Sequence, residues 1–413
     1  MKDNIILEKL LLENVGPFKK LELEFHKQLT VLIGNNGTGK STIINTVASL
    51  WTIDYFISAI VNKWLSRTHF GTTNSNIQMT VKDSMNQPEI SYEWPLESEG
   101  TLKSDSLFRT IDYKYPLIGM GSYRKFQKAN LHGPTREDTV NKNDLLKKFS
   151  QRYHQEIDSS IQEWVVNRYF FSREEWGGKY KRELEFFTHQ FNDLITEDFP
   201  VRFKTVSPLM DPVFETATGD TPFYQLSSGI QSICYMFYEI ISGLSQYYPE
   251  SENVFLEKGL VLIDEIEIHL HPEWQKVITS GLTKMFPNCQ FIVTTHSPII
   301  LSHSQKDEEI IQLTIENGEI KSEYIDSVYG WKAEDIYRDI MGLESTRVGE
   351  VEREIDELEE LLVEELDNGA LDEVKSQRLN ELSNKLNKIL PEGDPIVALK
   401  KLSSLRKATG KKK

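Results

Sequence analysis

The sequence predicts an α/β protein built around a mainly parallel sheet, with antiparallel β structure near its N-terminus, a helical insertion and a C-terminal helical hairpin. Short apolar runs separated by helical segments lead to this expectation; they cover residues 29–33, 259–265 and 290–295. Continuous apolar runs of this length are typical of strands that are buried on both faces of a parallel sheet.

Other elements follow from their periodicity. Apolar and polar residues alternate over 4–14 and 20–26 around Gly16-Pro17, which indicates an antiparallel hairpin. The apolar spacing of Ile43, Ile44, Val47 and Leu50 predicts a helix over 41–51. The further expected elements are a second hairpin at 76–94, a strand at 113–120, a hairpin at 201–217 and a helix at 230–247.

Two further regions are expected to be helical, one between residues 161 and 198 and one after about residue 344. Aromatic residues between 161 and 198 predict a helical subdomain with an aromatic core. After about residue 344, apolar residues recur at steps of three and four on either side of Asp367-Asn368-Gly369, which predicts a helical hairpin, and a last short helix is expected at 396–405. Such a hairpin must bury its stripe against the main fold or a partner. The expected divisions are 1–124, 125–200, 201–343 and 344–413.

Composition narrows the class of protein. The chain has 413 residues and a net charge of −16, so as a whole it should not be attracted to nucleic acid or to an anionic membrane. Its two cysteines, Cys234 and Cys289, lie in apolar runs and are expected to be buried thiols in a reducing compartment. Neither a secretory signal nor an apolar stretch of bilayer length occurs, so a cytoplasmic location is expected.

The strand at 29–33 leads into a phosphate-binding loop (residues 34–41, GNNGTGKS) that fits G-x-x-x-x-G-K-[ST] at every fixed position. Glycines permit positive φ, so that successive backbone N–H groups can surround a phosphate at a helix N-terminus. Lys40 is expected to reach the β- and γ-phosphates, and the Ser41 hydroxyl to complete a Mg²⁺ shell. The expected ATP-binding residues are Gly34, Asn35, Asn36, Gly37, Thr38, Gly39, Lys40, Ser41 and Thr42.

Two carboxylates follow the apolar strand at 259–263. Asp264 is expected to hold Mg²⁺ through a water or Ser41, and Glu265 is the candidate general base for the attacking water. The base is placed one residue beyond the metal aspartate because it must reach the far side of the γ-phosphate. The alternative, a solvated acidic turn, is disfavoured by the phosphate loop in the same chain.

Polar residues also follow the strand at 290–295. His296 should lie at the carboxyl end of a strand beside that of Asp264, where open α/β sheets bind ligands, and could sense the γ-phosphate. Elsewhere, His269 and His271 have the H-x-H spacing of a zinc site, but the sequence offers no further ligand set for one.

The segments GNNGTGKS, LSSGIQS (226–232), LIDE and TTHS occur in an order that resembles the ATP-binding-cassette ATPase heads of the SMC and RecF kind. This resemblance implies a head that dimerises around ATP and Mg²⁺, with Ser227, Ser228 and Gly229 of one chain contacting the nucleotide of the other, and Leu226 packing beneath. Ile230 departs from the family pattern and leaves the geometry of that contact open. Gln127 is one candidate for the family's metal-contacting glutamine.

The segment from Tyr329 to Gly342, with the helical hairpin after it, resembles the PtuA-type ATPase subunits of Septu and retron antiphage systems. That resemblance implies a homodimer or higher homo-oligomer, docking through 344–413, and a separate HNH nuclease partner. Contact with DNA or RNA is expected only through the complex. The residues after His296 show no nuclease pattern, so this chain is expected to have no nuclease activity of its own. The alternatives are a RecF-like repair ATPase that binds DNA directly and, with less support, the ATPase subunit of a transporter.

Overall fold

The computed structural model describes residues 5–51, 75–83, 90–96, 116–122, 124, 128, 130–135, 160–186, 201–305, 308–343, 345–391 and 394–396. The chain divides into two compact units, Met1–Ile336 and Tyr337–Lys413, which are described separately. The finer four-part division expected from the sequence remains a prediction.

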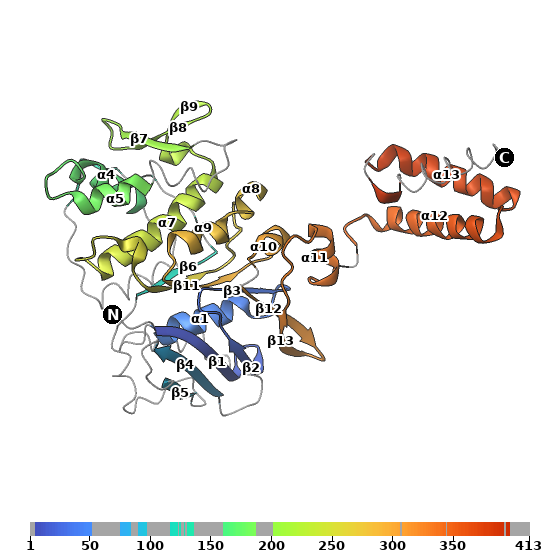
Figure 1. The fold of residues 1–413 in the computed structure, drawn as a ribbon, viewed down its shortest axis with the longest axis horizontal. Helices are drawn as coiled ribbons and strands as arrows, with labels where there is room; N and C mark the ends of the chain where they lie inside the picture. Colours follow the sequence, from blue (N-terminus) through green and yellow to red (C-terminus); the bar gives the residue numbers. More distant parts are fainter. Residues whose placement is uncertain are drawn as a thin grey trace. The chain divides into compact units, whose positions relative to one another are not determined.

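The first unit is built on a six-stranded sheet whose strand order is β13-β12-β3-β11-β10-β6 (Figure 1). Five of its strands are parallel, and β13 pairs antiparallel with β12 at one edge. The strands are β3 (Leu29–Gly34), β6 (Leu117–Met120), β10 (Gly259–Ile263), β11 (Cys289–Thr294), β12 (Glu309–Glu316) and β13 (Glu319–Ile325). The predicted α/β fold with a mainly parallel sheet is therefore confirmed.

A four-stranded antiparallel sheet, in the order β2-β1-β4-β5, precedes and follows helix α1 (Lys40–Trp51) along the chain. It is formed by β1 (Ile5–Val15), β2 (Phe18–Glu24), β4 (Ser75–Asp83) and β5 (Ile90–Leu96). Val15 pairs with Phe18 across Gly16-Pro17, and Gly16 has a φ of +53°. Both hairpins expected in this part of the sequence are confirmed.

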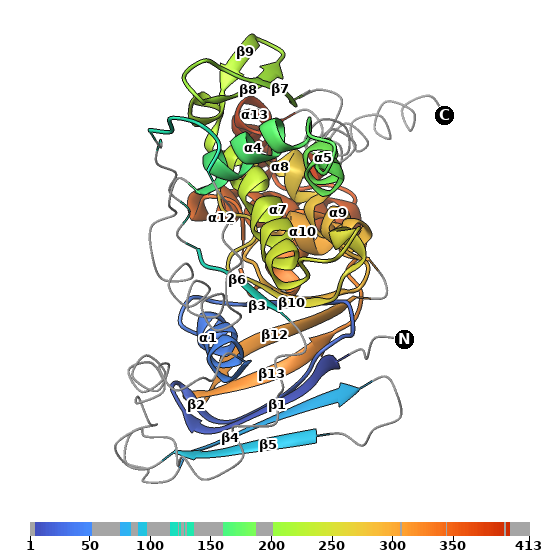
Figure 2. The same ribbon diagram turned by 90° about the vertical axis from the view of Figure 1, so that its left-hand side faces the viewer.

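The main hydrophobic core lies between these two sheets. Figure 2 shows the sheets as separate layers, with α1 beside them and helices α7, α9 and α10 on the other side of the six-stranded sheet. Alternation along the central strands explains this: Leu260 and Leu262 join the core with α1 residues Ile43 and Ile44, and intervening residues such as Val261 point to the other face. Both faces of the central strands are thus buried.

The helical face contains the 20-residue helix α7 (Ser228–Tyr247), most of whose residues are buried. Shorter elements accompany it: α8 (Pro272–Gln275), α9 (Ile278–Met285), α10 (Pro298–His303), η2 (Phe223–Gln225) and η3 (Val254–Leu256). The hairpin expected at 201–217 is confirmed, with a third strand added; the sheet comprises β7 (Arg202–Val206), β8 (Pro212–Thr216) and β9 (Gly219–Pro222).

Within the expected helical insertion, the described residues include α4 (Ser160–Phe171) and α5 (Gly178–Glu185). Trp164 and Phe186 are buried, as an aromatic core requires. Trp176, in the same range, is instead 61% exposed and contacts the rings of Phe171 and Tyr180 from the surface. Phe187 and Phe191 lie outside the described residues.

The second unit contains the expected helical hairpin, α12 (Gly349–Asn368) and α13 (Glu373–Ile389); α11 (Ala333–Asp339) spans the boundary between the units. Gly369 ends α12 with a φ of +77°, as its turn signal predicts. The arms bury their stripes against each other, with Leu358 and Leu382 in a shared core. The hairpin therefore has a core of its own, which the sequence analysis did not foresee. Most of the helix expected at 396–405 lies outside the described residues.

Candidate functional site

The phosphate loop joins β3 to α1, and two of its glycines are required by its backbone path. Gly34 has a φ of +145°, and a Cβ there would lie 2.4 Å from the Leu313 carbonyl oxygen of neighbouring β12. Gly39 has a φ of +87°, and its Cβ would lie 2.4 Å from the Phe18 ring. Positive φ and this close packing both exclude larger residues. Asn35, Asn36 and Gly37 are exposed at the tip of the loop.

Lys40 lies at the first position of α1 and is largely buried. Its ammonium group donates to the carbonyl oxygens of Gly34 (2.7 Å) and Asn35 (3.1 Å). Burial lowers the pKa of Lys40, whereas the nearby carboxylates of Asp264, Glu265 and Glu267 act to raise it. The fold therefore brings the phosphate-loop lysine and the acidic strand end into one electrostatic neighbourhood, although they are more than 220 residues apart in the chain.

Asp264 directly follows β10, and its carboxylate Oδ1 accepts a 2.6 Å hydrogen bond from the Thr294 hydroxyl of β11. Its backbone N–H donates to the Met120 carbonyl oxygen of β6 (2.9 Å). These two bonds orient the aspartate from strands on both sides of β10. Asp264 is 5% exposed, so its position is set by the protein rather than by solvent.

Glu265 has a φ of +50°, in the left-handed region that non-glycine residues seldom adopt. Its N–H donates to the Thr294 hydroxyl oxygen (2.7 Å). Burial, followed by the charges of Asp264 and Glu267, raises the pKa of the Glu265 carboxyl, and Lys40 and Arg124 oppose that rise. A carboxyl held in unusual backbone geometry with a raised pKa is typical of a general base.

His296 lies two residues beyond β11, the strand adjacent to β10, as expected. Glu267 positions this segment: its carboxylate accepts from the His296 N–H (2.7 Å) and from the Thr295 hydroxyl (2.8 Å). Burial, followed by the charge of Lys40, lowers the pKa of His296. The ring is thus favoured in its neutral form, which can donate one hydrogen bond and accept another.

Arg124 and Glu267 were missed as site residues by the sequence analysis. Arg124 is buried; its guanidinium donates to the carbonyl oxygens of Asp264 (3.1 Å) and Glu265 (3.3 Å), and burial lowers its pKa to about 10. No local pattern marks an arginine whose partners lie 140 residues away. Glu267 could have been suspected from the sequence, because it lies only two residues after Glu265.

The LSSGIQS segment forms the N-terminus of α7. Ser227 and Ser228 are exposed, and the Ser227 hydroxyl caps the helix by accepting from the Ile230 N–H. Leu226 is buried beneath, as expected. Gly229 is buried in its own chain, where an added Cβ would lie 2.6 Å from both the His269 carbonyl oxygen and the Trp274 ring.

The residues present fit ATP with Mg²⁺. The exposed tip of the loop and the helix N-terminus offer N–H groups for phosphates, and Gly37 at that tip would leave open space around an added Cβ. Ser41 and Asp264 supply the oxygen donors that Mg²⁺ prefers. Across the described ranges, no three histidine, cysteine, aspartate or glutamate side chains form a metal-binding group. His271 accepts from the Glu273 N–H and caps α8.

The remaining expectations from the sequence concern the cysteines, Gln127 and membrane-spanning helices. Cys234 and Cys289 are buried free thiols, and burial raises the pKa of Cys289 to about 12. Gln127 lies outside the described residues. Helices long and apolar enough to span a bilayer do not occur in the described parts of the chain.

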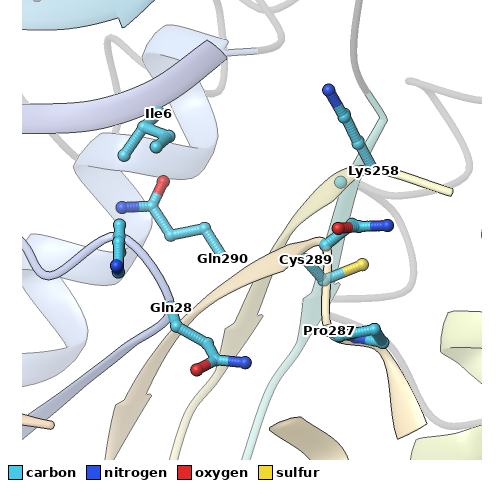
Figure 3. Close-up of a pocket in the computed structure, with 9 residues that line it drawn as sticks. Ile6, Gln28, Lys258, Pro287, Cys289 and Gln290 are labelled. Atoms are coloured by element: carbon cyan, nitrogen blue, oxygen red, sulfur yellow. The ribbon is translucent and has the colours of Figure 1, made fainter. Parts of the chain in front are cut away.

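A cavity of about 270 Å³ lies at the opposite edge of the sheet, where β10 and β11 begin. Figure 3 shows the Gln290 amide directed toward Ile6, and the Lys258 side chain extending away from Cys289. Parallel sheets bind ligands at their carboxyl edge, and Gln290 is engaged with the backbone of Leu7. This cavity is therefore not part of the nucleotide site.

Comparison with known proteins assigns the chain to a family. A family model described as "AAA domain, putative AbiEii toxin, Type IV TA system" matches residues 29–302, from β3 through most of α10. The chain belongs to this AAA-domain family. The matched range contains the phosphate loop, the LSSGIQS segment, the acidic strand end and His296.

Named relatives extend the comparison over nearly the whole chain. The Septu protein PtuA of Bacillus thuringiensis is 25% identical over 96% of this chain and 97% of its own length. The Retron Vc95 probable ATPase of Vibrio cholerae serotype O1 biovar El Tor is 25% identical over 72% of this chain and 71% of its own. The SMC head domain from Thermotoga maritima covers 78% of this chain and 99% of its own at 15% identity, with a TM-score of 0.46.

Proposed function

We propose that this protein is the ATP-binding and ATP-hydrolysing subunit of a bacterial antiphage defence complex. In this proposal two copies dimerise around ATP and regulate a separate HNH-type nuclease. The observation that carries the ATPase part is the convergence of Lys40, Asp264 and Glu265 at the carboxyl edge of the parallel sheet, where the charge of Asp264 acts to raise the pKa of both Lys40 and Glu265. The defence part is supported by the likeness to the Septu PtuA protein and the retron ATPase.

The chain's own residues suggest a division of labour. The phosphate loop and Lys40 bind the phosphates, and Ser41 and Asp264 hold Mg²⁺, which neutralises charge on the transferred phosphoryl group when it is bound. Thr294 fixes Asp264 and the Glu265 backbone through one hydroxyl. Glu265 accepts a proton from the attacking water, and neutral His296 contacts the γ-phosphate.

Dimerisation is proposed to bring the N-terminus of α7 in one copy into contact with the nucleotide bound by the other copy. Ser227 and Ser228 are exposed at the positive end of a long buried helix, which favours an approaching anion. A nucleotide bound by a second copy would supply that anion. Because only the closed dimer makes this contact, ATP would favour closure through its differential affinity for the two states.

In this proposal, cleavage of nucleic acid is carried out by the partner nuclease. The 344–413 region is proposed as the oligomer or partner docking element, and contact with DNA or RNA is proposed to occur through the complex. The cytoplasm is the proposed compartment, consistent with two buried free thiols.

The first experiment replaces Lys40 with alanine. We expect loss of Mg²⁺-dependent ATP binding and of phage protection together, because the lysine is buried beside the loop that would hold the phosphates. Lys204→Ala is the matched control, since Lys204 forms an exposed pair with Asp220 and should leave both properties unchanged. Undiminished phage protection by Lys40→Ala would refute a role for the nucleotide.

A second variant separates binding from hydrolysis. Glu265→Gln should keep ATP binding and abolish phosphate release, and sedimentation with Mg²⁺ and ATP should then show an accumulated dimer. A species that remains monomeric with ATP bound would contradict the shared-nucleotide proposal. Salt-dependent DNA binding by the isolated chain would instead favour the RecF-like alternative.

A further inference from the structure

Arg124 is a buried cation whose hydrogen bonds, within the described residues, all go to neutral groups. It is 4% exposed, and its Nε donates to the Gly121 carbonyl oxygen (3.3 Å) just after β6. Burying a charge without a carboxylate partner is costly unless every donor is satisfied. An apolar residue of similar size would avoid that cost, so the position of the guanidinium calls for a functional explanation.

The guanidinium connects α7 to the acidic strand end. One terminal nitrogen donates to the Ser232 hydroxyl (3.1 Å) and contacts the Met236 sulfur (3.8 Å) on α7. The other donates to the carbonyl oxygens of Asp264 (3.1 Å) and Glu265 (3.3 Å). The Ser232 hydroxyl in turn donates to the Ile268 carbonyl oxygen (3.3 Å), so both ends of the 264–268 segment are attached to α7.

We propose that Arg124 is a positioning residue that links the N-terminal part of α7 to the Glu265 backbone and thereby sets Glu265 for hydrolysis. This inference rests on the proposed function, because it assumes that Ser227 and Ser228 meet the nucleotide of a second copy. Ser232 is only five residues beyond Ser227 on the same helix. A shift of α7 on nucleotide contact is therefore transmitted through Ser232 and Arg124 to Glu265.

The backbone of Glu265 explains why such a link is needed. Its left-handed φ of +50° is strained for a non-glycine residue and persists only where neighbours hold it. Thr294 holds the N–H of Glu265, and Arg124 holds its carbonyl oxygen. A rigid guanidinium fork can hold this oxygen together with that of Asp264, whereas a lysine ammonium is a single flexible donor group.

The test compares two buried arginines. Arg124→Lys should lower kcat by about fivefold to tenfold with the KM for ATP within about twofold, because it disturbs the placement of the base and not ATP binding. Arg124→Gln should lower kcat further. Arg168→Lys is the control, since Arg168 is equally buried but pairs with Glu183 on α4 and α5, and its kcat should stay within about twofold of wild type.

The opposite results would overturn the inference. Unchanged kcat in Arg124→Lys, an equal fall in Arg168→Lys, or a rise in KM that accounts for the whole loss would each do so. If the arginine variants fail to fold, Ser232→Ala leaves Arg124 in place, removes the hydrogen bonds of the Ser232 hydroxyl to Arg124 and to the Ile268 carbonyl oxygen, and should lower kcat by about threefold or more at unchanged KM.

Amide hydrogen exchange separates this inference from the proposed function. In nucleotide-free protein, Arg124→Lys should speed exchange at the Ile268 N–H, which donates to the Glu265 carbonyl oxygen, more than Arg168→Lys does. With Mg²⁺ and a non-hydrolysable ATP analogue, wild type should gain protection at both 227–232 and 264–268, and Ser232→Ala only at 227–232. Equal protection of both segments in Ser232→Ala would refute the link and leave the proposed function intact, whereas failure of wild type to bind the analogue would refute the proposed function and, with it, the inference that rests on it.

Discussion

Replacing Thr294 with valine tests how the acidic strand end is held. Thr294 is fully buried; its hydroxyl donates to Asp264 Oδ1 at 2.6 Å and accepts from the Glu265 N–H at 2.7 Å. Valine has nearly the same shape, so the change removes two hydrogen bonds without creating a cavity. A bond to a charged group contributes about 1.5–3 kcal/mol, and an unsatisfied buried N–H costs about 1–3 kcal/mol. Because the two contributions are not additive, we expect the free energy of unfolding to fall by about 2–4 kcal/mol.

Equilibrium denaturation of the full chain, with the transition of the first unit followed by its tryptophans, measures this loss as a lower midpoint at constant slope. Thr294→Ser is the matched control: it keeps the hydroxyl, loses one methyl group and should cost about 1 kcal/mol. The valine variant should also lose ATP hydrolysis more than the serine variant does. A Thr294→Val protein no less stable than Thr294→Ser would refute the reasoning.

Three further predictions concern separate parts of the chain. Gly34→Ala should abolish Mg²⁺-ATP binding in a fluorescent-nucleotide assay because its Cβ meets the Leu313 backbone, whereas Gly37→Ala, with open space around it, should cost only about 1–2 kcal/mol of backbone strain. Burial raises the pKa of Glu308 from 4.5 to about 7, so its protonated form stabilises the fold fully below about pH 4.5 and that contribution is lost as pH rises through about 7. Glu308→Gln should therefore stabilise the chain by about 1–2 kcal/mol near pH 8.5 after solvent screening, and by little near pH 5, in denaturant titrations at the two pH values. Leu358→Ala should destabilise the second unit by about 2–5 kcal/mol, as seen by hydrogen exchange of α12, and Leu366→Ala should not, because Leu366 is 70% exposed.

The parts of the fold that the sequence predicted well are those with a local signal. The strands before Gly34, Asp264 and His296 are short apolar runs that end in chemistry-bearing residues, and the sheet brings their carboxyl ends together. The β12–β13 hairpin was missed although a signal existed. Asn317-Gly318 connects its strands, with φ values of +52° and +80°, and is a strong two-residue turn signal.

The contacts that orient the site could not be predicted in the same way. Arg124 meets Asp264, and Gln290 meets Leu7, across 140 and 283 residues respectively. Such pairs depend on which strands become neighbours, and periodicity specifies a strand's faces but not its neighbours. The hairpin core of the second unit was missed for a related reason: the stripes of α12 and α13 were identified, but not that they complement each other.

Gly229 has a packing role within its own chain in addition to the nucleotide contact that the family pattern implies. The family pattern implies that this glycine contacts the nucleotide of a second chain, but here it is buried against the His269 carbonyl oxygen and the Trp274 ring of its own chain. A larger residue would push α7 away from the segment that follows the acidic strand end, even in a monomer. Loss of activity in Gly229→Ala would therefore not distinguish a failed dimer contact from a displaced Glu265. Ser228 is exposed on the same turn, so a bulky replacement there is the sharper probe: it should block ATP-dependent dimerisation while leaving ATP binding by the single chain intact.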